Sequence, residues 1–191
     1  MFTLSIVAIL SLIVDPAIRV KVQKVWNAAP TYFFWDAASS SGKYHPFFDL
    51  GDHGVYRHSL LVAFFAHEGA SAQAIFTQRD VDCITAAGLL HDLIKRGVDG
   101  GDHTVFEHPL LAAKFIRDMF EGDEDMEYIA SLVEPHMGKW CTSKYSDAVL
   151  PTPKTHAEMA VSFADMIASR EILGRLHKPE TWAEEVRWEA E

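Results

Sequence analysis

Apolar residues recur at helical spacing in five stretches of the chain beyond residue 54. The first of these places Leu60, Leu61, Phe64 and Phe65 on neighbouring helical positions. The predicted core helices cover about residues 55–68, 80–95, 109–120, 123–134 and 155–176. No stretch alternates apolar and polar residues with the period of a strand, and no hairpin turn stands out. The pattern therefore predicts an all-α protein built on a bundle of five core helices.

Local signals mark where several of these helices begin. Asp80 is the predicted N-cap of the second core helix, and Pro109 suits the first turn of the third. The acidic run after Gly122 suits the N-terminus of the fourth helix. Thr155 and Glu158 have the spacing of a capping box, which opens the fifth helix.

The apolar segment from Phe2 to Val14 precedes this core. It is shorter than the roughly 20 residues of a membrane-spanning helix. No Lys or Arg stands before it, so a secretory signal also fits poorly. We expect a helix packed on the domain or on a second subunit rather than a membrane anchor, and then a helix that Asp15-Pro16 opens. The final segment, 177–191, predicts a C-terminal helix, and both terminal segments are candidates for a homodimer contact.

A long irregular stretch, residues 31–54, is rich in Ser, Gly, Pro and aromatic residues. Loops of this length are usually functional or disordered, and the density of Phe and Tyr favours an ordered loop lying over the domain. The aromatic run from Tyr32 to Trp35 is expected to be core under this loop. We therefore predict a single domain over residues 1–191. Its core covers about 54–176, its N-terminal helix and loop cover 1–53, and a C-terminal helix completes it.

Composition narrows the class of protein. Hydrophobic residues make up 49% of the 191 residues, which is typical of a globular chain. The net charge of -10 opposes stable binding to duplex nucleic acid, although a local basic pocket remains compatible with it. Cys83 and Cys141 are too few for a disulfide framework and stand outside any CxxC pattern. They fit a reducing compartment, so we expect a cytoplasmic protein.

The pair His91-Asp92 is the most informative feature, because it ends the apolar run AAGLLHDLIK. Buried polar groups are costly unless a metal or a partner offsets them. Asp165 stands among apolar residues in the fifth predicted helix, where an ionised carboxylate needs a cation. The other candidate ligands near the middles or ends of different predicted helices are His58, His108 and His136. Mixed imidazole and carboxylate ligands suit divalent Mn, Fe, Co, Ni or Zn, whereas Mg prefers oxygen ligands but remains possible.

This order, H…HD…H…H…D, resembles the HD superfamily of metal-dependent phosphohydrolases. The phrases SSSGKYHP, RHS, LLHDLIK, EHPLLAAKFI, HMGKW and ADMIASR are similar to a small bacterial and phage subgroup, and the layout is similar to the HD domains of certain 3′–5′ exoribonucleases. The chain departs at GDHGVYRHS, where relatives tend to carry a Gly-Gly-Leu run, so His53 and Tyr56 are expected to alter the pocket mouth or to add a ligand.

The resemblance implies a two-metal site and a reaction. His58, His91, Asp92 and Asp165 would hold the first metal, and Asp92 would bridge to a second metal held by His108 and His136. The expected reaction is cleavage of a phosphate ester of a nucleotide or short oligonucleotide by an activated water, as a phosphodiesterase or a nucleotide phosphatase. The alternative is a non-catalytic, metal-containing module that binds or senses nucleotides.

Basic and aromatic residues near these ligands are candidates for substrate contacts. We assign Asp92 and Lys95 catalytic roles, with Lys95 one helical turn beyond His91 and on the same face. The candidate substrate-binding residues are Lys43, His45, Arg57 and Lys139. His45 equally suits a plain turn before Pro46. Trp140 suits either base stacking or ordinary packing, and Arg170 is expected to be a surface or capping residue.

Overall fold

The computed structural model describes residues 4–39, 45–171 and 173, and within them the chain forms α-helices and two short 3-10 helices without a β-strand. In chain order these elements are α1 Ile6–Leu12, α2 Pro16–Asn27, η1 Thr31–Phe34, η2 Phe47–Asp49, α3 Gly54–Ser71, α4 Gln78–Leu90, α5 His108–Met119, α6 Glu124–Val133 and α7 His156–Ala168. The all-α prediction is therefore confirmed, and α3 to α7 correspond to the five predicted core helices.

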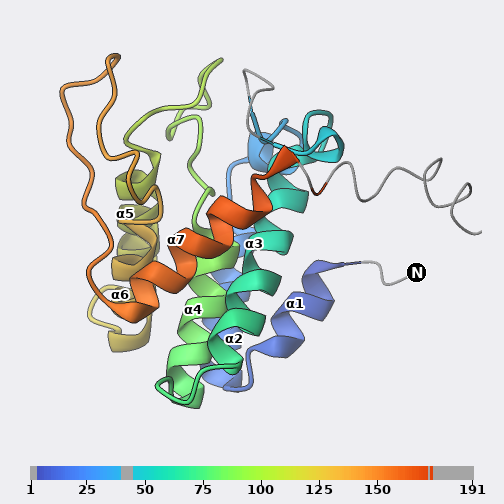
Figure 1. Ribbon diagram of the computed structural model, residues 1–191, viewed down its shortest axis with the longest axis vertical. Coiled ribbons are helices and arrows are strands. Elements are labelled where there is room, and N and C mark those ends of the chain that lie inside the picture. The colour runs from blue at the N-terminus through green and yellow to red at the C-terminus, as the bar shows by residue number, and fades with distance from the viewer. Residues whose placement is uncertain (1–3, 40–44, 172, 174–191) are drawn as a thin grey trace, which may run out of the picture.

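Helix α4 lies at the centre of the bundle. It packs against α2, α3, α6 and α7, and α7 runs obliquely across α3 and α4 (Figure 1). Residues 81–90 are all buried, because other helices cover every side of α4. Gly88 lets α3 approach closely, since a Cβ atom at this position would lie 3.1 Å from Cα of Ala63. This close packing sets the C-terminal end of α4 beside the middle of α3.

The observed ends of α4 and α7 correct three predictions. Thr77, not Asp80, is the N-cap of α4, and Asp80 completes the capping box by accepting from the Thr77 backbone N–H at 2.9 Å. Helix α4 ends at Leu90 instead of continuing to Lys95, because the chain then turns through residues 91–100. Helix α7 ends at Ala168, with Ser169 as its C-cap, rather than near residue 176.

Two predicted features lie outside the described residues. These are the C-terminal helix over 177–191 and the substrate-binding candidate Lys43.

The N-terminal pair of helices is docked on the core. Helix α1 contacts α3 and buries Ile9 and Leu10, which agrees with the predicted packed helix. The buried carboxylate of Asp82 in α4 accepts from the backbone N–H groups of Val14 at 3.0 Å and Asp15 at 2.8 Å. It thereby fixes the junction between α1 and α2. Among the described residues, no helix has both the length and the apolar character needed to cross a membrane.

Between α2 and α3 the chain forms the short helices η1 and η2, and both contact α3. Phe33 is buried and meets the ring of Trp26 edge-on, with 5.0 Å between ring centroids. Trp35 remains 60% exposed, so the prediction that the whole aromatic run is core was wrong at this residue. Trp35 follows η1 as its C-cap, and its ring lies against His53, with 4.6 Å between ring centroids, outside the cluster of core residues.

Candidate metal centre

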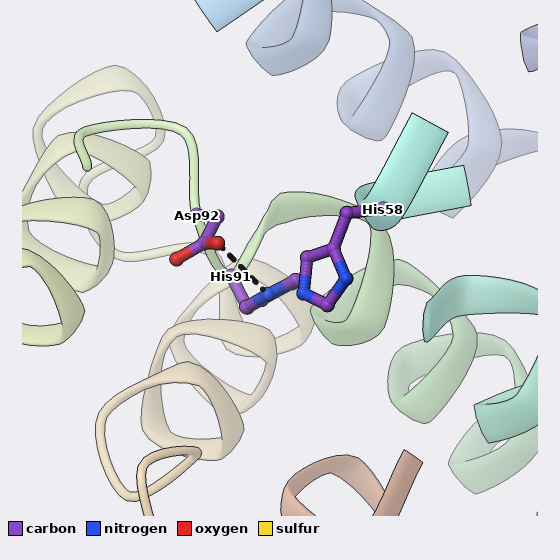
Figure 2. A group of neighbouring side chains, drawn as sticks. All are labelled: His58, His91 and Asp92. Carbon is purple, nitrogen blue, oxygen red and sulfur yellow. Dashed lines mark ion pairs between the residues drawn. The ribbon is translucent and has the colours of Figure 1, made fainter. Parts of the chain in front are cut away.

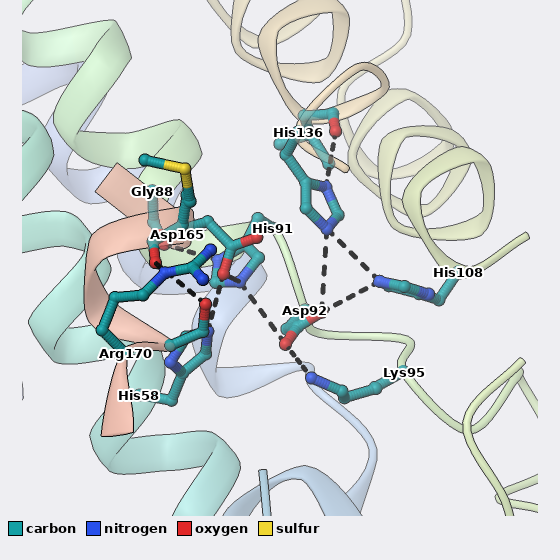
Figure 3. A network of polar contacts seen from close by, with 12 residues as sticks. His58, Gly88, His91, Asp92, Lys95, His108, His136, Asp165 and Arg170 are labelled. Carbon is teal, nitrogen blue, oxygen red and sulfur yellow. Dashed lines mark hydrogen bonds and ion pairs between the residues drawn. The ribbon is translucent and has the colours of Figure 1, made fainter. Parts of the chain in front are cut away.

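All six predicted ligands converge, although they come from five helices or the turns beside them. His58 lies in α3, His91 caps α4 and precedes Asp92, His108 opens α5, His136 lies in the turn after α6, and Asp165 lies in α7. Figure 3 shows their polar ends facing one another. Three overlapping triplets have donor atoms within 4.8 Å of one another: His58–His91–Asp92, His91–His136–Asp165 and Asp92–His108–His136.

Asp92 is the common member of two triplets and faces imidazoles with both oxygens. Its Oδ2 atom lies 3.4 Å from Nε2 of His91, the pair drawn in Figure 2. Its Oδ1 atom lies 3.1 Å from Nε2 of His108 and 3.9 Å from Nε2 of His136. Asp92 therefore presents one oxygen to His91 and the other to His108 and His136.

Asp165 closes the other side of the cluster. Its Oδ1 atom lies 3.0 Å from Nε2 of His58 and 3.8 Å from Nε2 of His91. His91 therefore stands between the two carboxylates.

Three of the histidines are oriented by backbone carbonyls of their own turns. The Nδ1 atoms of His91, His108 and His136 each lie 2.8 Å from the carbonyl oxygen three residues earlier. A carbonyl only accepts hydrogen bonds, so Nδ1 carries a proton, and in the neutral form of each ring the Nε2 lone pair points into the cluster. Such support is typical of metal-binding histidines.

This arrangement leaves acceptors facing acceptors, which is the physical test of whether a cation fits. The Nε2 atoms of His108 and His136 are 3.3 Å apart. Among the described residues, Asp92 Oδ1 and His91 Nε2 are buried without a hydrogen-bond partner. Buried polar atoms are normally paired, and a divalent cation between them would satisfy all of them. Imidazole with carboxylate suits first-row transition metals.

Burial and local charge set the protonation of the cluster. Burial lowers the pKa of His136 to about 3, and His91 and His108 act in the same direction. Burial raises the pKa of Asp92, but Lys95 and His91 outweigh it and hold that pKa well below its usual range. For His91 burial lowers the pKa, yet Asp92 reverses the direction and raises it. Ionised carboxylates and a neutral His136 are the forms that bind metal.

A cavity of about 440 Å³ opens over the cluster. Its volume lies in the range of small-molecule sites, roughly 300–1,000 Å³. Asp92, Asp165, His108 and His136 line its floor, and Trp140 and Arg170 are on its wall. A second hollow of about 500 Å³ lies next to it and shares Trp140.

Besides Asp92, two of the predicted catalytic or substrate residues reach this cavity. Lys95 lies in the turn after α4, not on the helix as expected, and its ammonium pairs with Asp92 Oδ2. Tyr32 holds that turn by donating to the Gly97 carbonyl at 2.8 Å. His45 lines the cavity, and its ring lies 4.7 Å from the ring of His58 between centroids.

The other predicted substrate residues have different surroundings. The Arg57 side chain contacts Asp49, with 3.7 Å from Nε to Oδ1, and the carbonyl of Phe48. Lys139 lines the second hollow. Neither lines the cavity over the cluster. His53, which the sequence left as a possible extra ligand, instead donates from Nδ1 to the Phe34 carbonyl at 2.6 Å.

Arg170 is the main cavity residue that sequence reasoning missed. Its Nε atom donates to the Met166 carbonyl at 2.8 Å, so the expected capping role is present. The same side chain also lines the cavity beside Asp165. Helical spacing gives no signal for this, because Arg170 lies beyond the end of α7.

Comparison with known proteins gives one match. No curated protein and no solved structure shows significant similarity to this chain. The family model described as HD domain matches residues 55–186, more than half of the chain, and this range contains all six converging residues. The chain therefore belongs to the HD domain family, whose members are generally metal-dependent phosphohydrolases.

Proposed function

We propose that this chain hydrolyses a phosphate ester of a nucleotide or short oligonucleotide at a two-metal site. The observation that carries the proposal is the orientation of His91, His108 and His136, whose Nδ1 atoms are committed to carbonyls and whose Nε2 atoms face Asp92 or one another. In the arrangement proposed, His58, His91, Asp92 and Asp165 hold one divalent cation. Asp92 bridges to a second, which His108 and His136 hold.

The bound cations would polarise the phosphoryl oxygen and make a water nucleophilic near neutral pH. Asp92, ionised and buried, fixes the spacing of the two groups of imidazoles. Lys95 supplies a positive charge on the cavity wall for the developing charge of the phosphoryl group. His45 borders the same cavity and is positioned to contact the ester. The cavity volume of about 440 Å³ supports a substrate of nucleotide size.

The experiment combines metal analysis with a substrate panel. Protein purified without chelator is assayed for Mn, Fe, Co, Ni and Zn, and then for turnover of p-nitrophenyl phosphate, bis-p-nitrophenyl phosphate, nucleotides and cyclic dinucleotides. We expect close to two ions per chain and metal-dependent release of product. Preference for the bis ester would identify a phosphodiesterase, and preference for the mono ester a phosphatase. Nucleotide binding without turnover under every metal would favour the non-catalytic sensing module instead.

Cellular location and oligomeric state remain sequence-based proposals. Cys83 and Cys141 are both free thiols, which supports a reducing compartment such as the cytoplasm. A homodimer is a further proposal, which light scattering of the metal-loaded protein would test.

A further inference from the structure

Arg170 stands at the end of α7 with its backbone and part of its side chain fixed. Its backbone N–H donates to the Ile167 carbonyl at 3.0 Å, and its Nε donates to the Met166 carbonyl at 2.8 Å. These contacts use one guanidinium N–H and leave the terminal amino groups to extend toward the cluster, as Figure 3 shows. The guanidinium is therefore presented to the cavity at the Asp165 side.

Within the part of the chain that the structure describes, no carboxylate pairs with Arg170, in contrast to several other arginines. Arg79, Arg96 and Arg117 each form ion pairs, at 2.8 Å with Asp125, 2.7 Å with Asp36 and 2.8 Å with Glu127. Among the described residues, Arg170 forms no such pair. An unpaired guanidinium on the wall of a cavity is chemically suited to bind an anion.

Trp140 limits where the guanidinium can go. The Arg170 Cζ atom lies 5.9 Å from the centroid of the Trp140 ring, and both side chains line the cavity. Guanidinium groups are attracted to the face of an indole ring at this separation. Arg170 is exposed to solvent and has a long side chain that can adopt many positions. The contact with Trp140 reduces the number of positions that its terminal amino groups sample.

From these contacts, and resting on the proposed function, we infer that Arg170 binds the non-bridging oxygens of the substrate phosphate and that Trp140 positions its guanidinium. Arg170 approaches from the Asp165 side of the cluster, whereas Lys95 is held at Asp92. The planar fork of Arg matches two phosphate oxygens, which a single ammonium does not. The ligand class is a phosphate ester with two accessible oxygens, or inorganic phosphate itself.

The first experiment measures binding of inorganic phosphate to Mn-loaded protein by calorimetry, together with KM and kcat for the best panel substrate. We expect R170Q to weaken phosphate binding and raise KM by about ten- to a hundredfold, while bound metal and melting temperature stay unchanged. R170K should recover only part of the affinity, because it keeps the charge without the fork. Phosphate affinity in R170Q equal to wild type would overturn the inference.

The second experiment separates positioning by Trp140 from direct contact with substrate. W140A should weaken phosphate binding less than R170Q, W140F should retain most of the affinity, and the double variant W140A/R170Q should bind as R170Q does. Losses that simply add in the double variant would show that Trp140 acts on the substrate independently of Arg170, and the positioning role would be wrong.

The same loop supplies a matched control. Lys144 lies 4.7 Å from the ring centroid of Tyr145, which is 84% exposed, and neither residue lines the cavity. K144Q and Y145A should therefore leave phosphate affinity unchanged. If the wild type turns over none of the panel substrates, the proposed function fails. The phosphate titration still decides the role of Arg170, because it needs no turnover.

Discussion

Two buried aspartates, Asp82 and Asp92, lie in or just beyond the same central helix and have opposite surroundings. Asp82 is fully buried, and its carboxylate accepts hydrogen bonds from three donors: the backbone N–H groups of Val14 and Asp15 and the side chain of Gln78 at 2.9 Å. Asp92 is 2% exposed, and its Oδ1 atom faces imidazole nitrogens that carry lone pairs.

The contrast shows how a structural carboxylate differs from one suited to bind a cation. Hydrogen bonds to donors offset the cost of burying Asp82, so its site is complete with protein atoms alone. The charge of Asp92 is only partly compensated, by the ammonium group of Lys95. Its neighbours His108 and His136 present hydrogen-bond acceptors instead of donors. Burial alone therefore does not identify a functional carboxylate, whereas the chemical type of its neighbours does.

The largest effect is expected from Asp92→Ala. Because Asp92 is the proposed bridge, this change should remove bound metal and reduce turnover to the level of the protein-free reaction. Elemental analysis and the panel assay measure both quantities on the same preparation. Full activity in this variant would end the catalytic interpretation of the cluster.

His136→Ala should have a smaller and more selective effect. It removes one of the two imidazoles proposed for the second metal but leaves His58, His91 and Asp165 in place, so one ion per chain should remain. We expect activity to fall by about ten- to a hundredfold. His67→Ala is the control, since its Nδ1 atom contacts Thr85 Oγ1 at 3.2 Å, away from the cluster. Loss of both ions in His136→Ala would show that the two sites are not separable.

Asp82→Ala should change stability and not chemistry. The substitution leaves the N–H groups of Val14 and Asp15 without their acceptor, at a cost of about 2–4 kcal/mol in the free energy of unfolding. Denaturant titration measures this loss, while metal content and kcat of the folded protein should match wild type. A loss of bound metal comparable to that of Asp92→Ala would erase the distinction between the two aspartates.

Asp49 is a third buried aspartate and gives the smallest effect, which depends on pH. Burial raises its pKa to about 7, although Arg57 and Lys95 oppose this, and neither oxygen accepts a hydrogen bond among the described residues. Its pKa is thus higher in the folded than in the unfolded chain, so the folded state holds an extra proton between about pH 4 and pH 7. Stability linked to Asp49 is greatest at acidic pH and falls as pH rises through this window.

Asp49→Asn should remove this slope. The melting temperature of the variant relative to wild type should therefore be higher at pH 8 than at pH 5. Asp118→Asn, at an exposed carboxylate, is the control and should show little change between the two values. An equal difference at both pH values for Asp49→Asn would mean that Asp49 is ionised throughout.

Much of the cluster was predictable from sequence, because its members differ sharply from their apolar neighbours. His91 and Asp92 end a run that is otherwise apolar, and Asp165 interrupts an apolar helix. The helices that carry them were also predictable from the spacing of apolar residues and from capping signals, such as the Thr155–Glu158 capping box that the structure confirms. The helix ends were less accurate: Lys95 reaches Asp92 from a turn, not from the helix face predicted for it.

The walls of the cavity were not predictable in the same way. Arg57 stands next to His58 in sequence, yet its guanidinium contacts Asp49 and Phe48. Arg170 is exposed and contacts the end of α7, as expected for a surface or capping residue, but its place in the cavity lining was not predicted. Long basic side chains can find hydrogen-bond or ion-pair partners in several directions, and the segments packed around them decide which direction is used.

The sequence by itself determined the helical class, the set of six candidate ligands and the family resemblance, because these depend on residue type and spacing along one chain. Tertiary structure alone decided that Asp82 binds backbone donors while Asp92 faces imidazoles, and that Arg170 rather than Arg57 reaches the cavity. The reason is physical: burial and partners come from segments distant in sequence, such as Val14 against Asp82, and local pattern carries no information about which distant segment will pack there.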